Sequence, residues 1–232
     1  MPVRQTFPPV ANVIAKASVV VVVVVLAVVG GAVDYFVRSS WMTGTDVAVS
    51  QPVPFSHLHH VRQLGIDCRY CHTSVEESAY ANIPPTETCM TCHSQIWTES
   101  PMLEPVRTSW QTGQPIQWNK VHDLSDFVYF NHSVHVNNGI GCESCHGRVD
   151  NMPLAWKENT LQMEWCLECH RNPEVNVRPR DEIYTMGYGG LVASAEGGEG
   201  EAEAVEAIDG HALVAEYGIE VGRLDNCSIC HR

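Results

Sequence analysis

The chain begins with one long apolar run and continues with a mixed pattern that has no sustained period. From Val10 to Val33 the only charged residue is Lys16. About twenty apolar residues are enough to cross a bilayer as a helix. The aliphatic stem of Lys16 can carry its ammonium group to the lipid headgroups. The pattern therefore predicts a transmembrane anchor at residues 10–37, preceded by a cytoplasmic tail at residues 1–9.

A cleavable signal peptide is the alternative, because it also has a basic start followed by an apolar stretch. The residues that end the run, GGAVD at 30–34, form a poor small-residue cleavage site, which favours a retained anchor. Arg4 and Lys16 precede most of the run, and this favours a cytoplasmic N-terminus. We therefore expect a single-pass protein of a bacterial inner membrane, with everything after the anchor on the periplasmic, extracytoplasmic side.

After the anchor, apolar residues occur in short groups and strand-like alternation is weak. The chain has 13 prolines and 17 glycines, which suit short helices joined by loops. The formal net charge of −13 disfavours nucleic acid as a partner. The predicted fold is mainly short α-helices and irregular loops, wrapped around something other than a large aliphatic core.

All ten cysteines fall in five copies of one motif, C-x-x-C-H, which is the attachment signature of a c-type haem. Residues three apart share a face of one helical turn, so both thiols can bond to the vinyl groups of one porphyrin. The predicted thioether residues are Cys68, Cys71, Cys89, Cys92, Cys142, Cys145, Cys166, Cys169, Cys227 and Cys230. The histidine after each pair can bind the iron from the proximal side. These predicted proximal ligands are His72, His93, His146, His170 and His231.

Paired C-x-x-C motifs also occur in zinc ribbons. Zinc does not require a histidine directly after every second cysteine, whereas c-type haem attachment does. The sequence therefore predicts a multihaem cytochrome c with five covalently bound haem c groups.

A repeat surrounds the motifs. The leader F-x-H-x-x-H-V begins at Phe55 and again at Phe130, and in both copies Gly-Ile and a C-x-x-C-H motif follow. Each copy then carries a second C-x-x-C-H. The chain is thus predicted to be a tandem of two dihaem units, residues 38–110 and 111–180. A monohaem half-unit follows at residues 211–232, with a single motif.

Five histidines in the leaders match the five predicted haems in number. We predict them as distal iron ligands: His57, His60, His132, His135 and His211. The first histidine of each unit is expected to serve that unit's first haem, and the target of the second stays open. The half-unit has Val214 in place of a second histidine, and His59 is expected to be an ordinary side chain. His122 and Met152 are contenders that could displace one of the five, and Met152 would give a His/Met haem.

An acidic linker is predicted at residues 181–210. Between residues 193 and 209 it has six acids and no basic residue, which is typical of a flexible, solvated segment. A docking site for a basic partner is the alternative. The half-unit behind this linker is expected to be a separable terminal station for electrons.

Residues 118–174, which contain the second leader and two motifs, resemble the pentahaem cytochrome subunit of alternative complex III. They are also similar to the multihaem subunit of the quinone reductase complex, and the leader is shared with class III cytochromes c. The resemblance implies an electron-transfer subunit of a membrane complex that oxidises quinol and passes electrons to a periplasmic acceptor. It also implies three kinds of partner: an iron–sulfur, molybdopterin-like subunit, polytopic quinone-binding subunits and a monohaem cytochrome c.

Two other functions compete with this one. The first is a stand-alone, membrane-anchored quinol dehydrogenase, which is disfavoured because one transmembrane span makes a poor quinone pocket. The second is a multihaem reductase, which needs an iron with an open position or an altered motif. All five motifs keep their histidine, and further histidines are plentiful. The sequence therefore favours electron transfer with no substrate-transforming site of its own.

Overall fold

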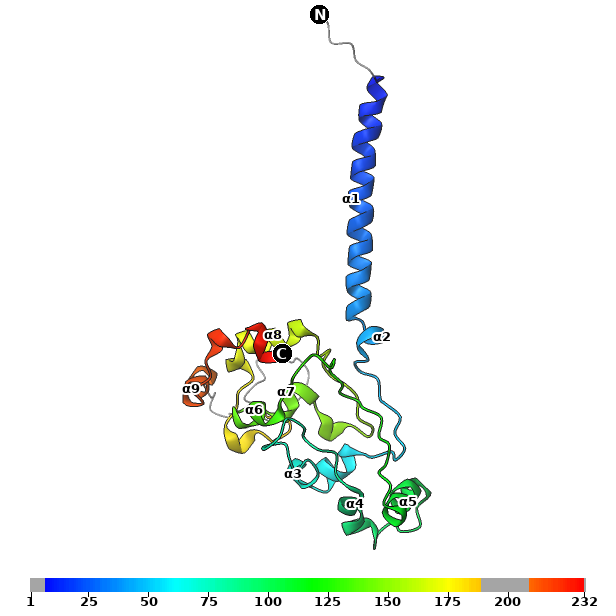
Figure 1. Ribbon diagram of the computed structural model, residues 1–232, viewed down its shortest axis with the longest axis vertical. Coiled ribbons are helices and arrows are strands. Elements are labelled where there is room, and N and C mark those ends of the chain that lie inside the picture. The colour runs from blue at the N-terminus through cyan, green and yellow to red at the C-terminus, as the bar shows by residue number, and fades with distance from the viewer. Residues whose placement is uncertain (1–6, 189–208, 232) are drawn as a thin grey trace, which may run out of the picture. The chain divides into compact units, whose positions relative to one another are not determined.

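The computed structural model describes residues 7–188 and 209–231, and the chain divides into two compact units after Thr45 (Figure 1). The first six residues of the predicted tail and most of the predicted acidic linker lie outside the described residues. The division falls eight residues after the end predicted for the anchor, because a short helix follows the long one.

The first unit is dominated by α1 (Pro9–Arg38), a helix of 30 residues that buries none of its side chains. An 18-residue window within it has a mean hydropathy of 2.8, which makes α1 a candidate membrane span by length and composition. At about 1.5 Å per residue it is long enough to cross a bilayer core of about 30 Å. A one-turn helix, α2 (Ser40–Thr43), follows it. Tyr35 and Trp41 are highly exposed near its end, as is typical of aromatic residues at a membrane interface.

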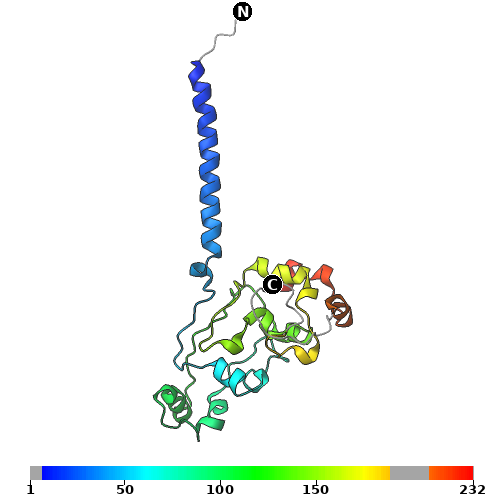
Figure 2. The same cartoon turned by 180° about the vertical axis from the view of Figure 1, so that it is seen from behind.

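The second unit consists of short helices and loops, as the sequence predicts (Figures 1 and 2). Its α-helices are α3 (Cys68–Cys71), α4 (Thr86–His93), α5 (Glu104–Thr112), α6 (His132–Asn137), α7 (Cys142–His146), α8 (Met163–Arg171), α9 (Gly210–Glu216) and α10 (Cys227–Cys230). Among the described residues, 3₁₀ turns lie between them at Pro101–Leu103, Val149–Asn151, Pro173–Val175, Arg180–Glu182 and Val221–Arg223. Ile140 and Val177 form an antiparallel bridge.

The three repeat copies end their leader helices in the same way. A glycine with positive φ terminates each one: Gly65 at 70°, Gly139 at 83° and Gly218 at 66°. The first leader has one residue more than the second between its first histidine and this glycine. It absorbs the extra residue as a π-helix at Leu58–Gln63, in which the wider hydrogen-bonded turn takes up one additional residue. The repeat is therefore a structural repeat as well as a sequence pattern.

In the described part of the second unit, three small apolar clusters hold the segments together, each with three buried side chains. One contains Val53, Leu103 and Val106. The other two cross the boundaries predicted between the repeat copies. Val75 of the first copy packs with Val136 and Ile183, and Leu213 of the half-unit packs with Ile140 and Val177. These clusters are small for a unit of this length, as expected where bound cofactors supply part of the apolar interior.

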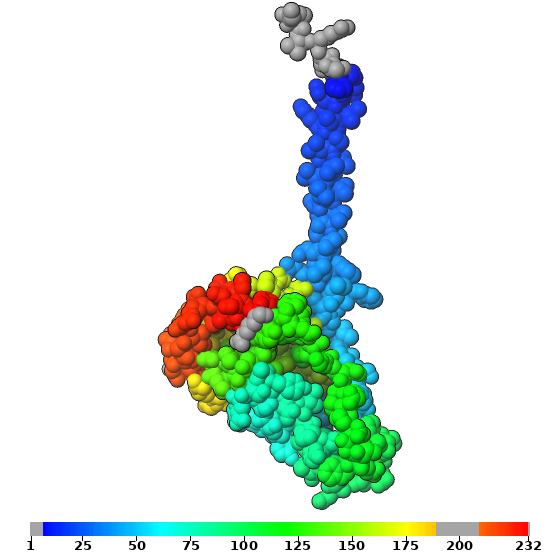
Figure 3. All heavy atoms as spheres, in the orientation of Figure 1, coloured from blue at the N-terminus to red at the C-terminus, as the bar shows by residue number. Residues whose placement is uncertain are grey.

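The half-unit contacts the second repeat copy in this structure, which does not favour the expected separable terminal station. The N–H of Tyr129 donates to the carbonyl of Cys230 at 2.8 Å, and the hydroxyl of Tyr217 donates to the carbonyl of Arg178 at 3.1 Å. In both views the C-terminal segment lies beside α8, and Figure 3 shows it against the green segment near residue 130. The half-unit therefore packs on the second repeat copy.

Candidate haem sites

The predicted thioether cysteines lie on short helical turns that present both thiols together. In α3, α7 and α10 the motif is nearly the whole helix, whereas α4 and α8 carry it at their C-terminal ends. The side chains of Asp67 and Asn226 cap α3 and α10 by accepting backbone N–H groups. All ten cysteines are free, so no disulfide competes for them.

The two full leaders have the same side-chain geometry. Phe55 meets His57 edge-on at 5.0 Å and stacks on His60 at 4.4 Å between ring centres. Phe130 meets His132 edge-on at 4.8 Å and stacks on His135 at 4.5 Å. The phenylalanine of the leader thus orients both histidines in each copy.

Most of the predicted ligands have one ring nitrogen bound by the backbone. A carbonyl oxygen lies 2.7–3.2 Å from Nδ1 of seven histidines: His60, His72, His93, His132, His135, His170 and His231. A carbonyl can only accept, so Nδ1 must carry the proton and Nε2 must carry the free lone pair. This is the arrangement that orients an imidazole as a metal ligand through Nε2.

Three predicted ligand pairs have the separation that an iron between them would require. The ring centres are 6.2 Å apart for His60 and His93, 6.4 Å for His132 and His146, and 6.1 Å for His135 and His170. Two metal–nitrogen bonds of roughly 2 Å each, with the ring radii added, give roughly 6 Å between ring centres. In the second copy the first histidine faces the copy's first motif. In both copies the second histidine faces the same copy's second motif, a target that the sequence leaves open.

His57 and His72 are also neighbours. Burial first, and then His72, lowers the pKa of His57 to about 4. The buried Nδ1 of His57 has no hydrogen-bond partner among the described residues. Met152, a contender, has its carbonyl bonded to the N–H of Leu58, and its side chain is 1% exposed. The thioether of Met152 therefore lies buried close to this leader.

The other contender, His122, lies beside His146, a predicted proximal ligand, next to the ring nitrogen that is not expected to bind iron. Its Nε2 is 3.2 Å from Nδ1 of His146, and the two rings meet edge-on at 4.3 Å. His132, and not His122, has the separation from His146 that an intervening iron requires. The structure therefore gives no support to His122 as the distal ligand opposite His146.

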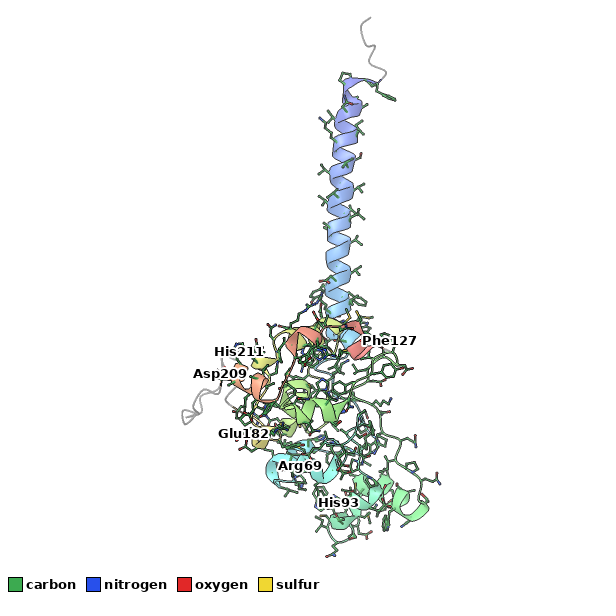
Figure 4. All side chains as sticks on the ribbon, turned by 60° about the vertical axis from the view of Figure 1, so that its left-hand side comes forward. Arg69, His93, Phe127, Glu182, Asp209 and His211 are labelled. Atoms are coloured by element: carbon green, nitrogen blue, oxygen red, sulfur yellow. The ribbon has the colours of Figure 1, made fainter. Side chains whose placement is uncertain are left out.

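His211 is not close to the motif of its own half-unit. It is exposed at the start of α9, whereas Nδ1 of His231 bonds to the carbonyl of Phe127 at 3.1 Å. His211 and Phe127 lie on opposite sides of the view in Figure 4. The structure therefore gives no support to the expectation that His211 faces the haem of its own half-unit, since α9 packs against the 3₁₀ turn at Pro173–Val175.

Burial favours the neutral imidazole at several of the predicted ligands, and iron ligation requires that form. It is the largest cause lowering the pKa of His60, His135 and His146, and for His146 the value falls to about 3. The other causes that lower these values are neighbouring imidazoles. The neutral form is thus favoured at His60, His135 and His146.

The thiols of different motifs approach one another in a defined order. They interact in pairs: Cys71 with Cys89, Cys68 with Cys142, Cys145 with Cys169, and Cys166 with Cys230. The side chains of Cys68 and Cys142 share a hydrogen bond, which is the largest cause lowering the pKa of Cys68. The motifs are therefore neighbours in the order second, first, third, fourth, fifth, which differs from their order in the chain.

Sequence reasoning missed Arg178, whose side chain is 1% exposed beside the third motif. Its guanidinium donates to the carbonyl of Thr185 at 3.0 Å and lies 3.9 Å from the carboxylate of Glu143. A Cβ on Gly141 would come within 2.4 Å of this guanidinium. The sequence contained only a weak indication that a large side chain packs here, namely the glycine directly before Cys142.

No cluster of three or more His, Cys, Asp or Glu side chains that could hold a metal ion occurs in the described part of the chain. A haem iron takes only two ligands from the protein, because the porphyrin supplies the others. The paired imidazoles and the paired thiols therefore fit c-type haem as a donor set.

Comparison with known proteins gives two similarities. A family model described as cytochrome c7 and related cytochrome c matches residues 128–232, which contain the second leader and the last three motifs. The chain is also 27% identical over 173 residues to the menaquinone reductase, multiheme cytochrome c subunit, of Nitratidesulfovibrio vulgaris. That alignment covers 62% of this chain and 82% of the relative. The similarities support a multihaem cytochrome c with covalently bound c-type haem, which acts in electron transfer.

Proposed function

We propose that this chain binds five haem c groups and conducts electrons within a quinol-oxidising membrane complex of the alternative complex III type. The observation that carries the proposal is the unbroken series of neighbouring motifs, from the second through the first, third and fourth to the fifth. In Figure 4, His93 of the second motif lies toward one end of the unit and Phe127, which holds His231, toward the other. Such a series supports a wire whose two ends face different partners.

The proposed ligands follow from the pair geometry. His60 serves the haem of His93, His132 that of His146, and His135 that of His170. His57 serves the haem of His72, with Met152 as its competitor. For the haem of His231, the distal ligand must come from outside the half-unit's leader or from a movement of α9, since His211 is exposed in this structure.

Haem iron supplies one-electron transfer, and the residues of this chain set the conditions for it. Two imidazole ligands keep the iron six-coordinate, so that redox change causes little rearrangement. Burial and the hydrogen bonds at Nδ1 tune each potential. The same arrangement disfavours a multihaem reductase, because three of the proximal histidines face a second histidine.

The proposal of a membrane anchor rests on α1, and the proposal of partner subunits rests on the similarity to a subunit of a menaquinone reductase. We propose α1 as the anchor, with the haem-binding unit on the periplasmic side. The proposed partners are an iron–sulfur, molybdopterin-like subunit, polytopic quinone-binding subunits and a monohaem cytochrome c or another periplasmic acceptor. A single span offers no enclosed quinone pocket, which favours a complex over a stand-alone dehydrogenase.

A second candidate is electron delivery in the opposite direction, toward menaquinone. The observation that favours it is the similarity to a subunit of a menaquinone reductase. The wire itself is indifferent to direction, so the partner subunits decide between the two candidates.

The test is purification of the full-length chain from its membrane in mild detergent, followed by identification of the co-purifying subunits. We expect five haems by mass, polytopic subunits in the same complex, and haem reduction by added menaquinol. Rapid reoxidation of the haems by added menaquinone would instead favour the second candidate. A chain that purifies alone and retains quinol oxidation would overturn the proposal of a complex.

A further inference from the structure

His146 differs from the other predicted proximal ligands in what its Nδ1 contacts. His72, at the same position in the first repeat copy, bonds through Nδ1 to the carbonyl of Asn82 at 2.7 Å. Nδ1 of His146 instead meets Nε2 of His122 at 3.2 Å, with the ring planes 76° apart. An edge-on approach between two ring nitrogens is the geometry of a hydrogen bond and excludes simple stacking. The third motif is therefore supported by a side chain where its repeat counterpart is supported by the backbone.

The direction of this hydrogen bond follows from the role predicted for His146. His146 must use Nε2 for the iron, and its Nδ1 therefore carries the proton. Nε2 of His122 is then the acceptor.

We propose that His122 is a positioning residue for the haem of Cys142 and Cys145: its Nε2 accepts the Nδ1–H of His146 and orients that ring toward the iron. An acceptor at Nδ1 makes an imidazole a stronger donor through its other nitrogen, which stabilises the ferric state. This proposal depends on haem attachment at the third motif, and it does not depend on the quinone-linked complex.

The proposal has a consequence for how this one potential can be altered. Backbone carbonyls support the other four predicted proximal histidines, and a side-chain substitution cannot remove a carbonyl. A single substitution at residue 122 can remove the acceptor of His146. The reduction potential of the haem at the third motif therefore depends on the side chain of residue 122, which a single substitution can replace.

The experiment compares three variants of the full-length, haem-loaded protein. His122→Ala removes the acceptor. His122→Gln places an amide oxygen close to the position of Nε2 and should restore the bond. His59→Ala is the matched control, because His59 is a half-buried imidazole that bonds to Gln63 and has no predicted ligand role. Haem content by mass, low-spin spectra, carbon monoxide binding and a spectroelectrochemical titration are measured for each.

For His122→Ala we expect five haems, unchanged low-spin spectra and no carbon monoxide binding. One component of the titration should move to higher potential, and His122→Gln should return it most of the way toward the wild-type position. In the His59→Ala titration, the component that moves in His122→Ala should stay at its wild-type position. A high-spin, carbon monoxide-binding haem in His122→Ala would overturn the proposal, because it would make His122 an iron ligand. Titrations of His122→Ala that match wild type would also overturn it, as would loss of a haem in His122→Gln. Absence of haem from the wild-type third motif would instead show failure of the proposed function itself.

Discussion

The three glycines that end the leader helices allow the packing of the half-unit to be tested against internal controls. Gly65, Gly139 and Gly218 occupy equivalent positions, and each has a positive φ. An added Cβ at Gly65 or Gly218 would meet nothing within 4 Å. At Gly139 it would lie 2.4 Å from the ring of Tyr217 and 2.9 Å from the carbonyl oxygen of Arg178. Alanine at any of the three positions therefore costs backbone strain, whereas alanine at Gly139 also costs a steric clash.

The shared cost is left-handed backbone strain, which is about 1–2 kcal/mol for a residue with a Cβ. Gly139→Ala adds overpacking, typically about 1–3 kcal/mol. For a chain of this size, about 1 kcal/mol corresponds to a fall in melting temperature of roughly 2–4 °C. We therefore expect Gly139→Ala to melt at least about 2 °C below Gly65→Ala and Gly218→Ala.

The assay is thermal unfolding of the haem-loaded variants, followed by circular dichroism, with haem content checked by mass. Adding Tyr217→Ala should recover part of the cost of Gly139→Ala, because the ring that clashes is gone, and this appears as coupling in a double-mutant cycle. Equal melting temperatures for Gly139→Ala and Gly218→Ala, or purely additive effects in the cycle, would refute the packing of the half-unit on the second copy.

Three further predictions follow from the ligand pairs and from burial. His60→Ala should uncover the iron of the His93 haem and give a high-spin signal with carbon monoxide binding, whereas a fully low-spin spectrum would contradict that pairing. Replacing Cys227 and Cys230 with alanine should remove one haem and also change the spectrum of the His170 haem. The reason is that the carbonyl of Leu224, which supports His170, lies just before this motif. Unchanged spectra of the four remaining haems would instead support the separable terminal station. The pKa of His122 is about 4 in the fold and near 6.5 when unperturbed, so between these values the unfolded chain binds a proton that the folded chain does not. Stability should therefore fall as the pH drops from about 6.5 to about 4, less steeply in His122→Gln, and denaturant unfolding at several pH values measures the two slopes.

The nonsequential order of the motifs bears on how partners can be arranged. Cys68 and Cys142 begin equivalent motifs of the two copies, and their side chains share a hydrogen bond. The first motifs of the two copies are thus neighbours, while the second motif of the first copy, at Cys89, and the motif at Cys230 lie at the ends of the series. Partners that donate and accept electrons are therefore expected to approach these two ends.

The attachment motifs were predictable from the sequence because their chemistry is local. Two thiols and an imidazole within five residues are enough to predict a c-type haem site, whatever surrounds them. The apolar helix was predictable for a similar reason, since composition and length alone make α1 a candidate span. The repeat extended this to the leaders, where equal spacing produced equal geometry around Phe55 and Phe130.

Contacts between distant segments were decided by the tertiary structure. The pairing of His135 with His170 joins residues 35 positions apart, and nothing in either segment specifies the other. The carbonyls that support the proximal histidines come from Asn82, Ile96, Leu224 and Phe127, and a carbonyl is common to every residue type. Pattern analysis has no means of finding them.

The half-unit and His122 both show that residue type and spacing do not determine the neighbours of a side chain. The half-unit resembles a full copy in sequence, yet Leu213 and Tyr217 bind it to the second copy and leave His211 exposed. His122 has the residue type of an iron ligand, yet it lies at Nδ1 of His146 and not opposite an Nε2. Residue type and spacing determine which groups can bind iron, whereas long-range packing determines which nitrogen faces which neighbour.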